Sequence, residues 1–290
     1  MTAIDTGLQD LKRQHPEWEP WLAVVQEILR ESTNPQWDAV VPDFTGAQQS
    51  NIPLLAGATL ALEQRSVRRL LEQLIRIACR NGTAKMATLE PALDSHLDIL
   101  TLFKASLRQD SDYLKKTAAA LGADPEAFEA VASLVPLPFL QACNRRWKLS
   151  TAPGWLEGYC PVCGTWPALT EVRGVERNRY FRCGRCGGEW RAHCLFCAYC
   201  GMNDHEELVS LVPEKSGAGR MIEACKRCLG YVKTFTTLEG SAPTKVILDD
   251  LGSVDLDVAA VEQGYQRPQG TGYALDMTIV GDGLTPAQRL

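Results

Sequence analysis

Four C-x-x-C pairs lie between residues 160 and 228: Cys160-Pro-Val-Cys163, Cys183-Gly-Arg-Cys186, Cys197-Ala-Tyr-Cys200 and Cys225-Lys-Arg-Cys228. Two residues between cysteines let both sulfurs of one tight turn face a single cation, and two such turns complete a tetrahedral site. The gaps between successive pairs are 19, 10 and 24 residues. This spacing predicts two four-thiolate metal sites, the first pair joined to the second and the third to the fourth. An interleaved pairing fits the same spacing.

The residues around the cysteines predict zinc-ribbon or rubredoxin-like turns. Glycine follows three of the four pairs, at Gly164, Gly187 and Gly201. Glycine permits the positive φ that such a turn needs, and the amides of the turn can donate to the first sulfur. We expect strands at residues 168–172 and 179–182, from Glu189, and at residues 208–212, 221–224 and 229–235.

Three cysteines fall outside these pairs. Cys194 could replace Cys197 as the partner of Cys200, but the recurring C-x-x-C-G pattern favours Cys197, which leaves Cys194 as a spare and buried thiol. Cys79 and Cys143 lie on apolar helix faces and are predicted to be core residues.

A disulfide framework is the competing explanation for the cysteines, and it requires an oxidising compartment. The first ten residues, Met1 to Asp10, have no basic start, apolar core or small-residue cleavage site. No apolar run reaches the roughly 18 residues that a membrane span needs. A cytoplasmic protein with metal-bound thiolates is therefore expected. A thioredoxin-like pair would explain one C-x-x-C but not four.

The charge distribution argues against nucleic acid as a partner. The chain has 290 residues and a net charge of −5. Residues 1–150 carry −2, residues 151–240 carry +1 and residues 241–290 carry −4. A nucleic-acid binder usually shows a basic footprint. Only residues 171–191 are locally basic, and a solvated ribbon face is the simpler interpretation of the arginines there, which are Arg173, Arg177, Arg179, Arg182, Arg185 and Arg191.

The first half of the chain is predicted to be helical. Apolar residues recur there every three or four positions. Helices are expected at residues 17–31, 60–80, 91–108, 111–121, 127–135 and 139–149, with a long connection at residues 37–59. An acidic helix is expected at residues 246–264, followed by a poorly ordered tail at residues 265–290.

These patterns predict an α+β protein. A helical domain at residues 1–150 precedes two metal ribbons, at residues 151–193 and 194–240, and an acidic C-terminal helix and tail at residues 241–290. The sequence contains no Gly-rich phosphate loop and no H-E-x-x-H motif. No catalytic or cofactor-binding residue is therefore assigned, and the protein is not expected to be an enzyme.

The sequence resembles the formate dehydrogenase accessory protein FdhE family. The resemblance rests on the motifs Trp155…Cys160-Pro-Val-Cys163-Gly164…Pro167, Arg179-Tyr-Phe-Arg-Cys183…Cys186…Glu189-Trp190, Cys197…Cys200, Cys225…Cys228…Tyr231 and Asp249-Asp250-Leu251…Leu256-Asp257…Glu262-Gln-Gly264-Tyr265. It covers residues 130–267 with specific motifs and the helical half more loosely. Cys194 departs from the family pattern.

The resemblance implies a cytoplasmic factor that binds the catalytic subunit of a respiratory formate dehydrogenase before export. It also favours iron in two rubredoxin-type sites, although zinc accepts the same ligands. The eight ligands would be Cys160, Cys163, Cys183, Cys186, Cys197, Cys200, Cys225 and Cys228. Four thiolates close each site, so it would be structural or a one-electron centre. The alternatives are a rubredoxin-like redox or oxygen-sensing protein and a zinc-ribbon nucleic-acid binder.

Overall fold

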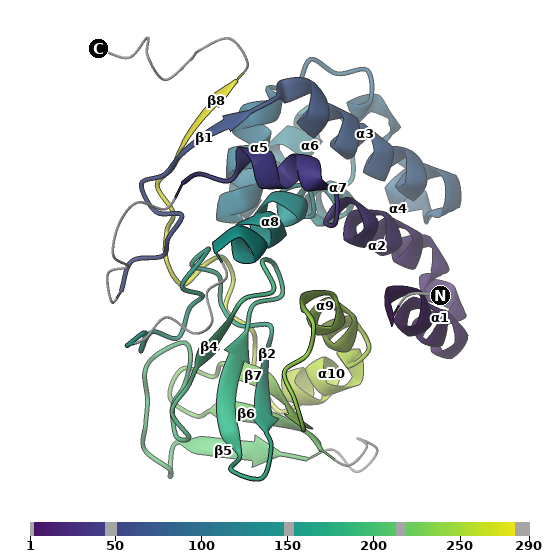
Figure 1. Ribbon diagram of the computed structural model, residues 1–290. Coiled ribbons are helices and arrows are strands. Elements are labelled where there is room, and N and C mark those ends of the chain that lie inside the picture. The colour runs from purple at the N-terminus through teal and green to yellow at the C-terminus, as the bar shows by residue number, and fades with distance from the viewer. Residues whose placement is uncertain (1–2, 44–50, 148–153, 213–218, 282–290) are drawn as a thin grey trace. The chain divides into compact units, whose positions relative to one another are not determined.

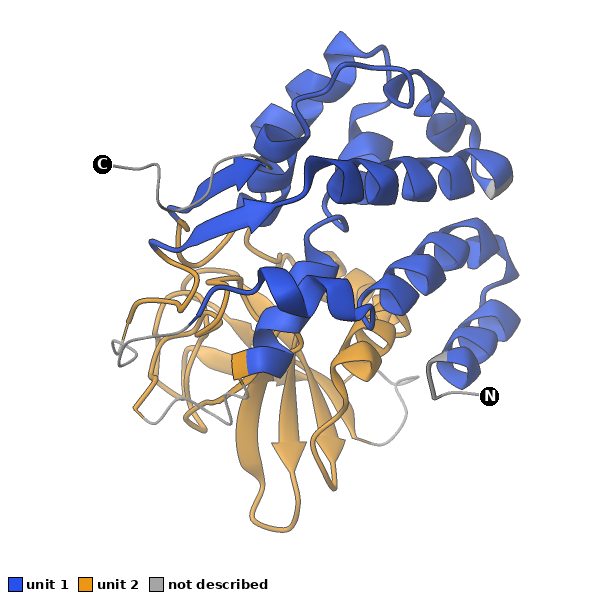
Figure 2. Cartoon of the chain, turned by 45° about the horizontal axis from the view of Figure 1, so that its top comes forward, with its two compact units in different colours: residues 1–43, 57–146, 276–290 blue, residues 44–56, 147–275 orange. Residues whose placement is uncertain are grey.

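The computed structural model describes residues 3–43, 51–147, 154–212 and 219–281. The chain divides into two compact units (Figures 1 and 2). Unit 1 comprises residues 1–43, 57–146 and 276–290, and unit 2 comprises residues 44–56 and 147–275. Among the described residues, no helix has both the length and the apolar character needed to cross a membrane.

Unit 1 is built from helices whose apolar stripes form its core. Leu22, Val25, Ile28 and Leu29 are buried on α2, as their spacing predicts. The α-helices are α1 (Ala3–Gln14), α2 (Glu19–Glu31), α3 (Gln64–Asn81), α4 (Ala84–Ala87), α5 (Ile99–Arg108), α6 (Ser111–Ala120), α7 (Pro125–Ala132) and α8 (Leu137–Trp147). Short 3₁₀ turns occur at η1 (Pro16–Trp18), η2 (Pro35–Val40) and η3 (Glu90–Ala92).

The helix predicted at residues 91–108 is wrong in its first half. The described helix α5 begins at Ile99, after Asp98 accepts a hydrogen bond from the Thr101 amide at 3.1 Å. The Arg68 guanidinium donates to the carbonyls of Ser95 and Leu97, at 3.3 and 2.7 Å. Those carbonyls are therefore bonded to a side chain of α3 instead of to a following helical turn.

A small parallel sheet also corrects two predictions. Residues 59–62 form strand β1 (Thr59–Leu62), so the predicted helix at 60–80 starts only at Gln64. Strand β1 pairs in parallel with β8 (Thr278–Gly281), which lies in the tail predicted to be poorly ordered. Leu275 and Met277 of that tail are also buried. Alternate residues of the tail are apolar, so in an extended strand they face the same side and can be buried. The rest of the predicted tail, residues 282–290, lies outside the described residues.

Unit 2 centres on a six-stranded sheet with the order β4-β3-β2-β7-β6-β5. The strands are β2 (Leu169–Arg173), β3 (Asn178–Arg182), β4 (Glu189–Arg191), β5 (Leu208–Leu211), β6 (Arg220–Cys225) and β7 (Tyr231–Thr237), close to the predicted positions. Strands β2 to β4 form one antiparallel ribbon, and β5 to β7 form another. Parallel pairing of β2 with β7 joins the ribbons into one sheet. The predicted fold class, helices followed by two ribbon modules, is confirmed by this structure.

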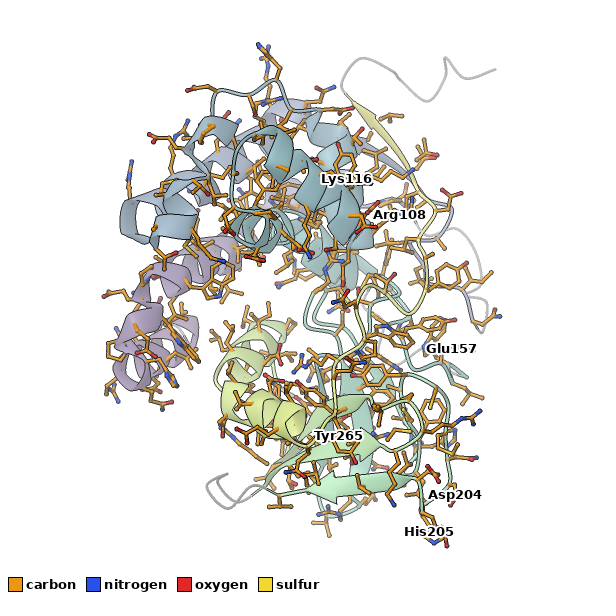
Figure 3. All side chains as sticks on the ribbon, turned by 180° about the vertical axis from the view of Figure 1, so that it is seen from behind. Arg108, Lys116, Glu157, Asp204, His205 and Tyr265 are labelled. Carbon is orange, nitrogen blue, oxygen red and sulfur yellow. The ribbon has the colours of Figure 1, made fainter. Side chains whose placement is uncertain are left out.

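The acidic segment after the sheet forms two helices and not the predicted single one. These are α9 (Pro243–Leu251) and α10 (Val254–Glu262). Leu256 and Ala260 of α10 pack with Ile222, Ala224 and Tyr231 of the sheet, and Tyr265 covers this cluster (Figure 3). The break falls at Ser253, where Oγ donates to the Asp249 carbonyl at 2.6 Å.

A buried ion cluster holds α9 and α10 on the sheet. The side chain of Lys233, on β7, is 0% exposed, and its Nζ lies 2.8 Å from both Asp250 and Asp257. The same Nζ donates to the Asp250 carbonyl at 2.6 Å. Arg267 lies 2.7 Å from Asp250 and 3.0 Å from Asp257, so two cations face two carboxylates. Burial alone would raise the pKa of Asp250, but Arg267 and then Lys233 lower it below its ordinary value. The four charges therefore compensate one another around the buried ammonium group of Lys233, while Asp250, Asp257 and Arg267 are partly exposed.

We predict that Lys233→Met lowers the free energy of unfolding by about 3 kcal/mol, because removing one member of a buried ion cluster leaves a carboxylate without compensation. Urea unfolding followed by circular dichroism measures the loss. Lys245→Met is the matched control, since Lys245 is 59% exposed in its pair with Asp249. The control should change the unfolding free energy by less than about 1 kcal/mol. Equal losses in the two variants would contradict a special role for the buried cluster.

Candidate metal centres

Eight cysteine sulfurs gather into two clusters in unit 2. Within each cluster the sulfurs all lie within 4.8 Å of one another. The first cluster is Cys160, Cys163, Cys183 and Cys186, and the second is Cys197, Cys200, Cys225 and Cys228. The pairing of the first C-x-x-C with the second, and of the third with the fourth, is as predicted, and the interleaved pairing is wrong.

The first cluster is buried and its turns have the expected geometry. Its sulfurs approach to 3.5 Å between Cys160 and Cys186 and between Cys163 and Cys183. All four cysteines are buried. The Cys186 amide donates to the Cys183 sulfur at 3.4 Å, and the Gly188 amide donates to the Cys186 sulfur at 3.3 Å. Such amide bonds stabilise the thiolate form, which is the form that binds a metal.

The second cluster is more exposed than the first. Its sulfurs lie 3.6 Å apart between Cys197 and Cys228 and 3.7 Å apart between Cys200 and Cys225. Cys200 is exposed and Cys228 is partly buried. Solvent and reagents can therefore reach one edge of the second cluster directly.

Three of the four turns end in a glycine with positive φ, at 69° for Gly164, 74° for Gly187 and 71° for Gly201. The fourth turn places Leu229 in the same region, with φ of 58°. A leucine there is uncommon because its Cβ crowds the backbone. The Leu229 carbonyl accepts a hydrogen bond from the Gln266 amide at 2.8 Å. The fourth turn is thus fastened to the segment that follows α10.

The structure places the three remaining cysteines apart from the clusters. Cys194 is exposed and does not join the second cluster, which supports the choice of Cys197 as partner of Cys200. The prediction that Cys194 is buried is wrong, because it lies in the connection after β4 and not under a ribbon. Cys143 is fully buried as predicted. Cys79 is only partly buried, with its sulfur 3.3 Å from the Met86 carbonyl.

The donor chemistry of the first cluster fits a metal cation. Burial raises the pKa of Cys160 well above its ordinary value, and hydrogen bonds with neighbouring thiols raise that of Cys186. Hydrogen bonds from Cys160, Cys183 and Cys186 lower the pKa of Cys163. Four adjacent buried thiols thus cannot all ionise by themselves. A bound cation removes this conflict, because a coordinated thiol is deprotonated.

The second cluster also has four cysteine sulfurs as donors, but it is more exposed to solvent. Burial raises the pKa of Cys197 above its ordinary value and raises that of Cys228 to about 11. Four sulfurs fill a tetrahedral shell and leave no position for water or substrate. Iron and zinc both accept such a shell. A metal bound in either cluster would cross-link two turns.

Aromatic rings connect the two clusters within unit 2, a feature that the cysteine spacing does not reveal. Tyr199, between Cys197 and Cys200, packs edge-on against Trp166 with ring centroids 5.3 Å apart. Trp166 in turn packs against Tyr159, the residue before Cys160, at 6.2 Å. In the sequence, the only indication of this contact is that aromatic residues stand next to the cysteines. The two turns therefore support one another through side-chain packing as well as through the sheet.

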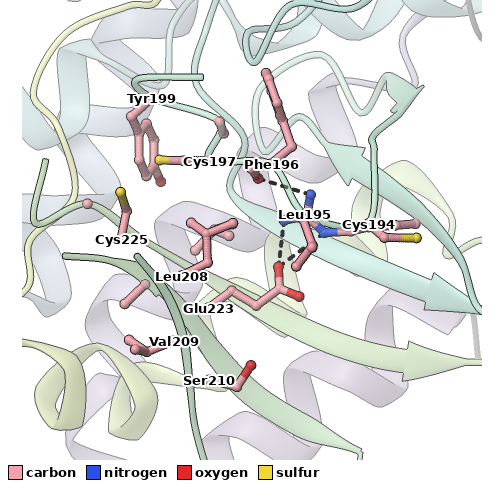
Figure 4. Close-up of a pocket in the computed structure, with 15 residues that line it drawn as sticks. Cys194, Leu195, Phe196, Cys197, Tyr199, Leu208, Val209, Ser210, Glu223 and Cys225 are labelled. Carbon is pink, nitrogen blue, oxygen red and sulfur yellow. Dashed lines mark hydrogen bonds and ion pairs between the residues drawn. The ribbon is translucent and has the colours of Figure 1, made fainter. Parts of the chain in front are cut away.

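A cavity of about 120 Å³ lies beside the second cluster, between the Cys197–Cys200 turn and strands β5 and β6 (Figure 4). Arg179 and Glu223 meet in its lining, where Arg179 also donates to the carbonyls of His193 and Phe196, at 2.9 and 3.2 Å. This ion pair connects the first ribbon, which carries Arg179, to the second, which carries Glu223.

We predict that Gly187→Ala destabilises the protein by about 2 to 4 kcal/mol. Gly187 has φ of 74°, and an added Cβ would lie 2.2 Å from the Cβ of Pro243 at the start of α9. The substitution therefore adds overpacking to backbone strain. Chemical unfolding of the purified variants measures the change.

Gly264→Ala is the control for backbone strain alone. Gly264 also has positive φ, 85°, but no atom lies within 4 Å of an added Cβ. We expect a loss of about 1 kcal/mol for it. If Gly187→Ala is no worse than Gly264→Ala, the first cluster's turn does not pack tightly on α9.

The comparisons with known proteins agree on one family. Residues 194–273 match the family described as FdhE, C-terminal domain. A Protein FdhE homolog of Pseudomonas aeruginosa is 32% identical over 149 residues, covering 47% of this chain and 48% of the relative. Another FdhE homolog, of Stutzerimonas stutzeri, is 30% identical over 186 residues, covering 61% of this chain and 60% of the relative. The match thus spans about half the length of the curated relatives.

The fold has a counterpart among solved structures. The crystal structure of the FdhE protein from Pseudomonas aeruginosa superposes with a TM-score of 0.55 at 23% sequence identity. The superposition covers 93% of this chain and 94% of that one. Together with the sequence matches, this confirms the resemblance that the cysteine motifs indicated.

Proposed function

We propose that this chain, a relative of the FdhE proteins, is an accessory factor for the assembly of a respiratory formate dehydrogenase. In this proposal it binds the catalytic subunit in the cytoplasm before export. It acts by binding and not by catalysis, and no catalytic residue is assigned to it. The observation that carries the proposal is the pair of closed four-cysteine clusters, the second of which lies inside the residues that match the FdhE C-terminal domain.

We assign one metal ion to each cluster, with the eight cysteines as ligands and iron favoured over zinc. The gathered sulfurs support this assignment, since turns distant in sequence converge on two points. A metal in a closed thiolate shell supplies cross-linking and, if it is iron, a one-electron couple. Neither kind of site hydrolyses a substrate, which fits a docking protein better than an enzyme.

A docking role also agrees with how unit 2 is built. The two ribbons share one sheet, and the buried ion cluster around Lys233 fastens α9 and α10 to it. Loss of either cluster would release the turns at the ends of these strands. A rigid surface assembled from both ribbons would then be lost, and partner binding with it.

Affinity capture with the full-length chain tests the proposed partner. We expect the wild type to retain the catalytic subunit of formate dehydrogenase from an anaerobic lysate. Cys160→Ser and Cys225→Ser should each reduce retention at least tenfold, because each removes a ligand from one cluster. The control is Cys79→Ser, outside both clusters, which should capture as the wild type does. Undiminished capture by both cluster variants would contradict the role of the metal ribbons, and no capture by the wild type would contradict the function itself.

Metal analysis tests the site assignment. Protein purified without oxygen should hold two metal ions per chain, and Cys160→Ser and Cys225→Ser should each retain one. A chelator should remove metal faster from the second cluster, because Cys200 is exposed while the first cluster is buried. Metal content and visible absorption over time report both quantities. Equal release rates, or a content that the substitutions do not change, would contradict the assignment.

The second candidate function is a rubredoxin-like redox or oxygen-sensing protein. The exposed sulfur of Cys200 favours it, since electrons or oxygen can approach that edge of the cluster. Protein that contains only zinc and still captures its partner would exclude this alternative. Reversible loss of visible absorption on reduction would support it.

A further inference from the structure

The arginines of the first ribbon divide into two groups in the structure. Three of the six arginines between residues 171 and 191 are neutralised by carboxylates. Arg182 lies 2.8 Å from Glu171, and Arg173 lies 2.6 Å from Glu189. Arg179 is paired with Glu223, as described above. Arg185, in the second turn, interacts electrostatically with the sulfurs of the first cluster. These four cations therefore have structural roles within the unit.

Arg177 and Arg191 form the second group. In the described part of the chain, no carboxylate lies within ion-pair distance of either guanidinium. Arg191 donates to the Asn178 side chain at a long 3.4 Å. Arg177 is exposed and stands in the tight turn between β2 and β3, with φ of 54°. Among the described residues, the positive charges of these two arginines therefore have no carboxylate partner.

Both arginines line the same cavity of unit 2. The cavity has a volume of about 510 Å³, and Trp155, His193 and Glu176 also contribute to its lining. One oxygen of Glu176 accepts a hydrogen bond from Asn178 at 2.8 Å. The volume lies in the range of small-molecule sites, which are typically about 300 to 1,000 Å³. The cavity thus has the size of a ligand site, and its two arginines without a carboxylate partner outnumber the one carboxylate of Glu176.

We propose that this cavity binds a small molecule carrying a phosphate group, held by the guanidinium groups of Arg177 and Arg191. A guanidinium presents its N–H groups as a planar fork that matches the oxygens of a phosphate. The double negative charge of a phosphate group suits two cations, whereas one carboxylate would neutralise only one. Trp155 and the exposed Leu156 give the cavity an apolar side for the body of the ligand. This site is independent of the proposed maturation role.

Calorimetric titration of the full-length, metal-loaded chain with phenyl phosphate tests the proposal. The substitutions are Arg177→Asn and Arg191→Gln. Asparagine tolerates the left-handed backbone that Arg177 adopts, and glutamine keeps a donor for Asn178. We expect saturable binding by the wild type, a loss of affinity of about tenfold for each variant, and weaker binding at high salt.

Two controls make the result specific. Arg69→Gln removes an exposed arginine from α3 in unit 1, and it should leave the affinity for phenyl phosphate unchanged. Benzoate offers the same ring with a carboxylate, and it should bind at least tenfold more weakly than phenyl phosphate. Circular dichroism and metal content establish that each variant is folded.

Several outcomes would overturn the proposal. They are the absence of saturable binding by the wild type, unchanged affinity in the variant that carries both substitutions, and equal affinity for benzoate. Binding of hexaglutamate in preference to phenyl phosphate would also overturn it, because the surface would then be a docking site for acidic polypeptide.

Discussion

The gathering of eight thiol groups into two clusters is the constraint on which unit 2 depends. Each cluster joins two turns that are distant in the chain: Cys163 and Cys183 are 20 positions apart, and Cys200 and Cys225 are 25 positions apart. The second turn follows β3 directly and the fourth joins β6 to β7, so each cluster ties a turn within one ribbon to a turn that precedes that ribbon. Buried thiols so close together are unfavourable as a group of anions, and a shared cation relieves this. Metal binding at the two clusters would therefore be coupled to folding.

Contacts outside the clusters join the two ribbons of unit 2 to each other and to the helices α9 and α10. Parallel pairing of β2 with β7 makes a continuous sheet, and the contact between Trp166 and Tyr199 joins the turns on one side. Lys233 provides the third connection, because its buried charge requires the carboxylates of α9 and α10. None of these contacts involves a cysteine. A binding surface that spans both ribbons consequently depends on side chains that metal-site motifs do not include.

Local patterns predicted much of this fold. Cysteine spacing and the following glycines gave the two clusters, and alternating residues gave the ribbon strands, because each is determined within a turn or one strand. Predictions failed where distant residues intervene. Arg68 donates hydrogen bonds to carbonyls before α5, so that helix begins later than predicted. Strand β1 pairs with β8, so part of the predicted tail is a strand. Cys194 was expected to be buried, but a free cysteine is buried only where the surrounding chain covers it, and Cys194 is exposed in the connection after β4.

The sequence by itself determined the chemistry of the clusters, since the type and spacing of the thiols are local properties that any fold must accommodate. It also determined the helical and ribbon halves through the periodicity of their apolar residues. Only the tertiary structure decided the rest: that the interleaved pairing of the turns does not form, that the ribbons share a sheet, and which arginines have no carboxylate partner among the described residues. The reason is that Arg182 and Arg177 are equivalent as residues, and only the chain around them brings Glu171 to one and leaves the other at the edge of a cavity. Pairing and burial depend on the whole chain, whereas ligand spacing does not.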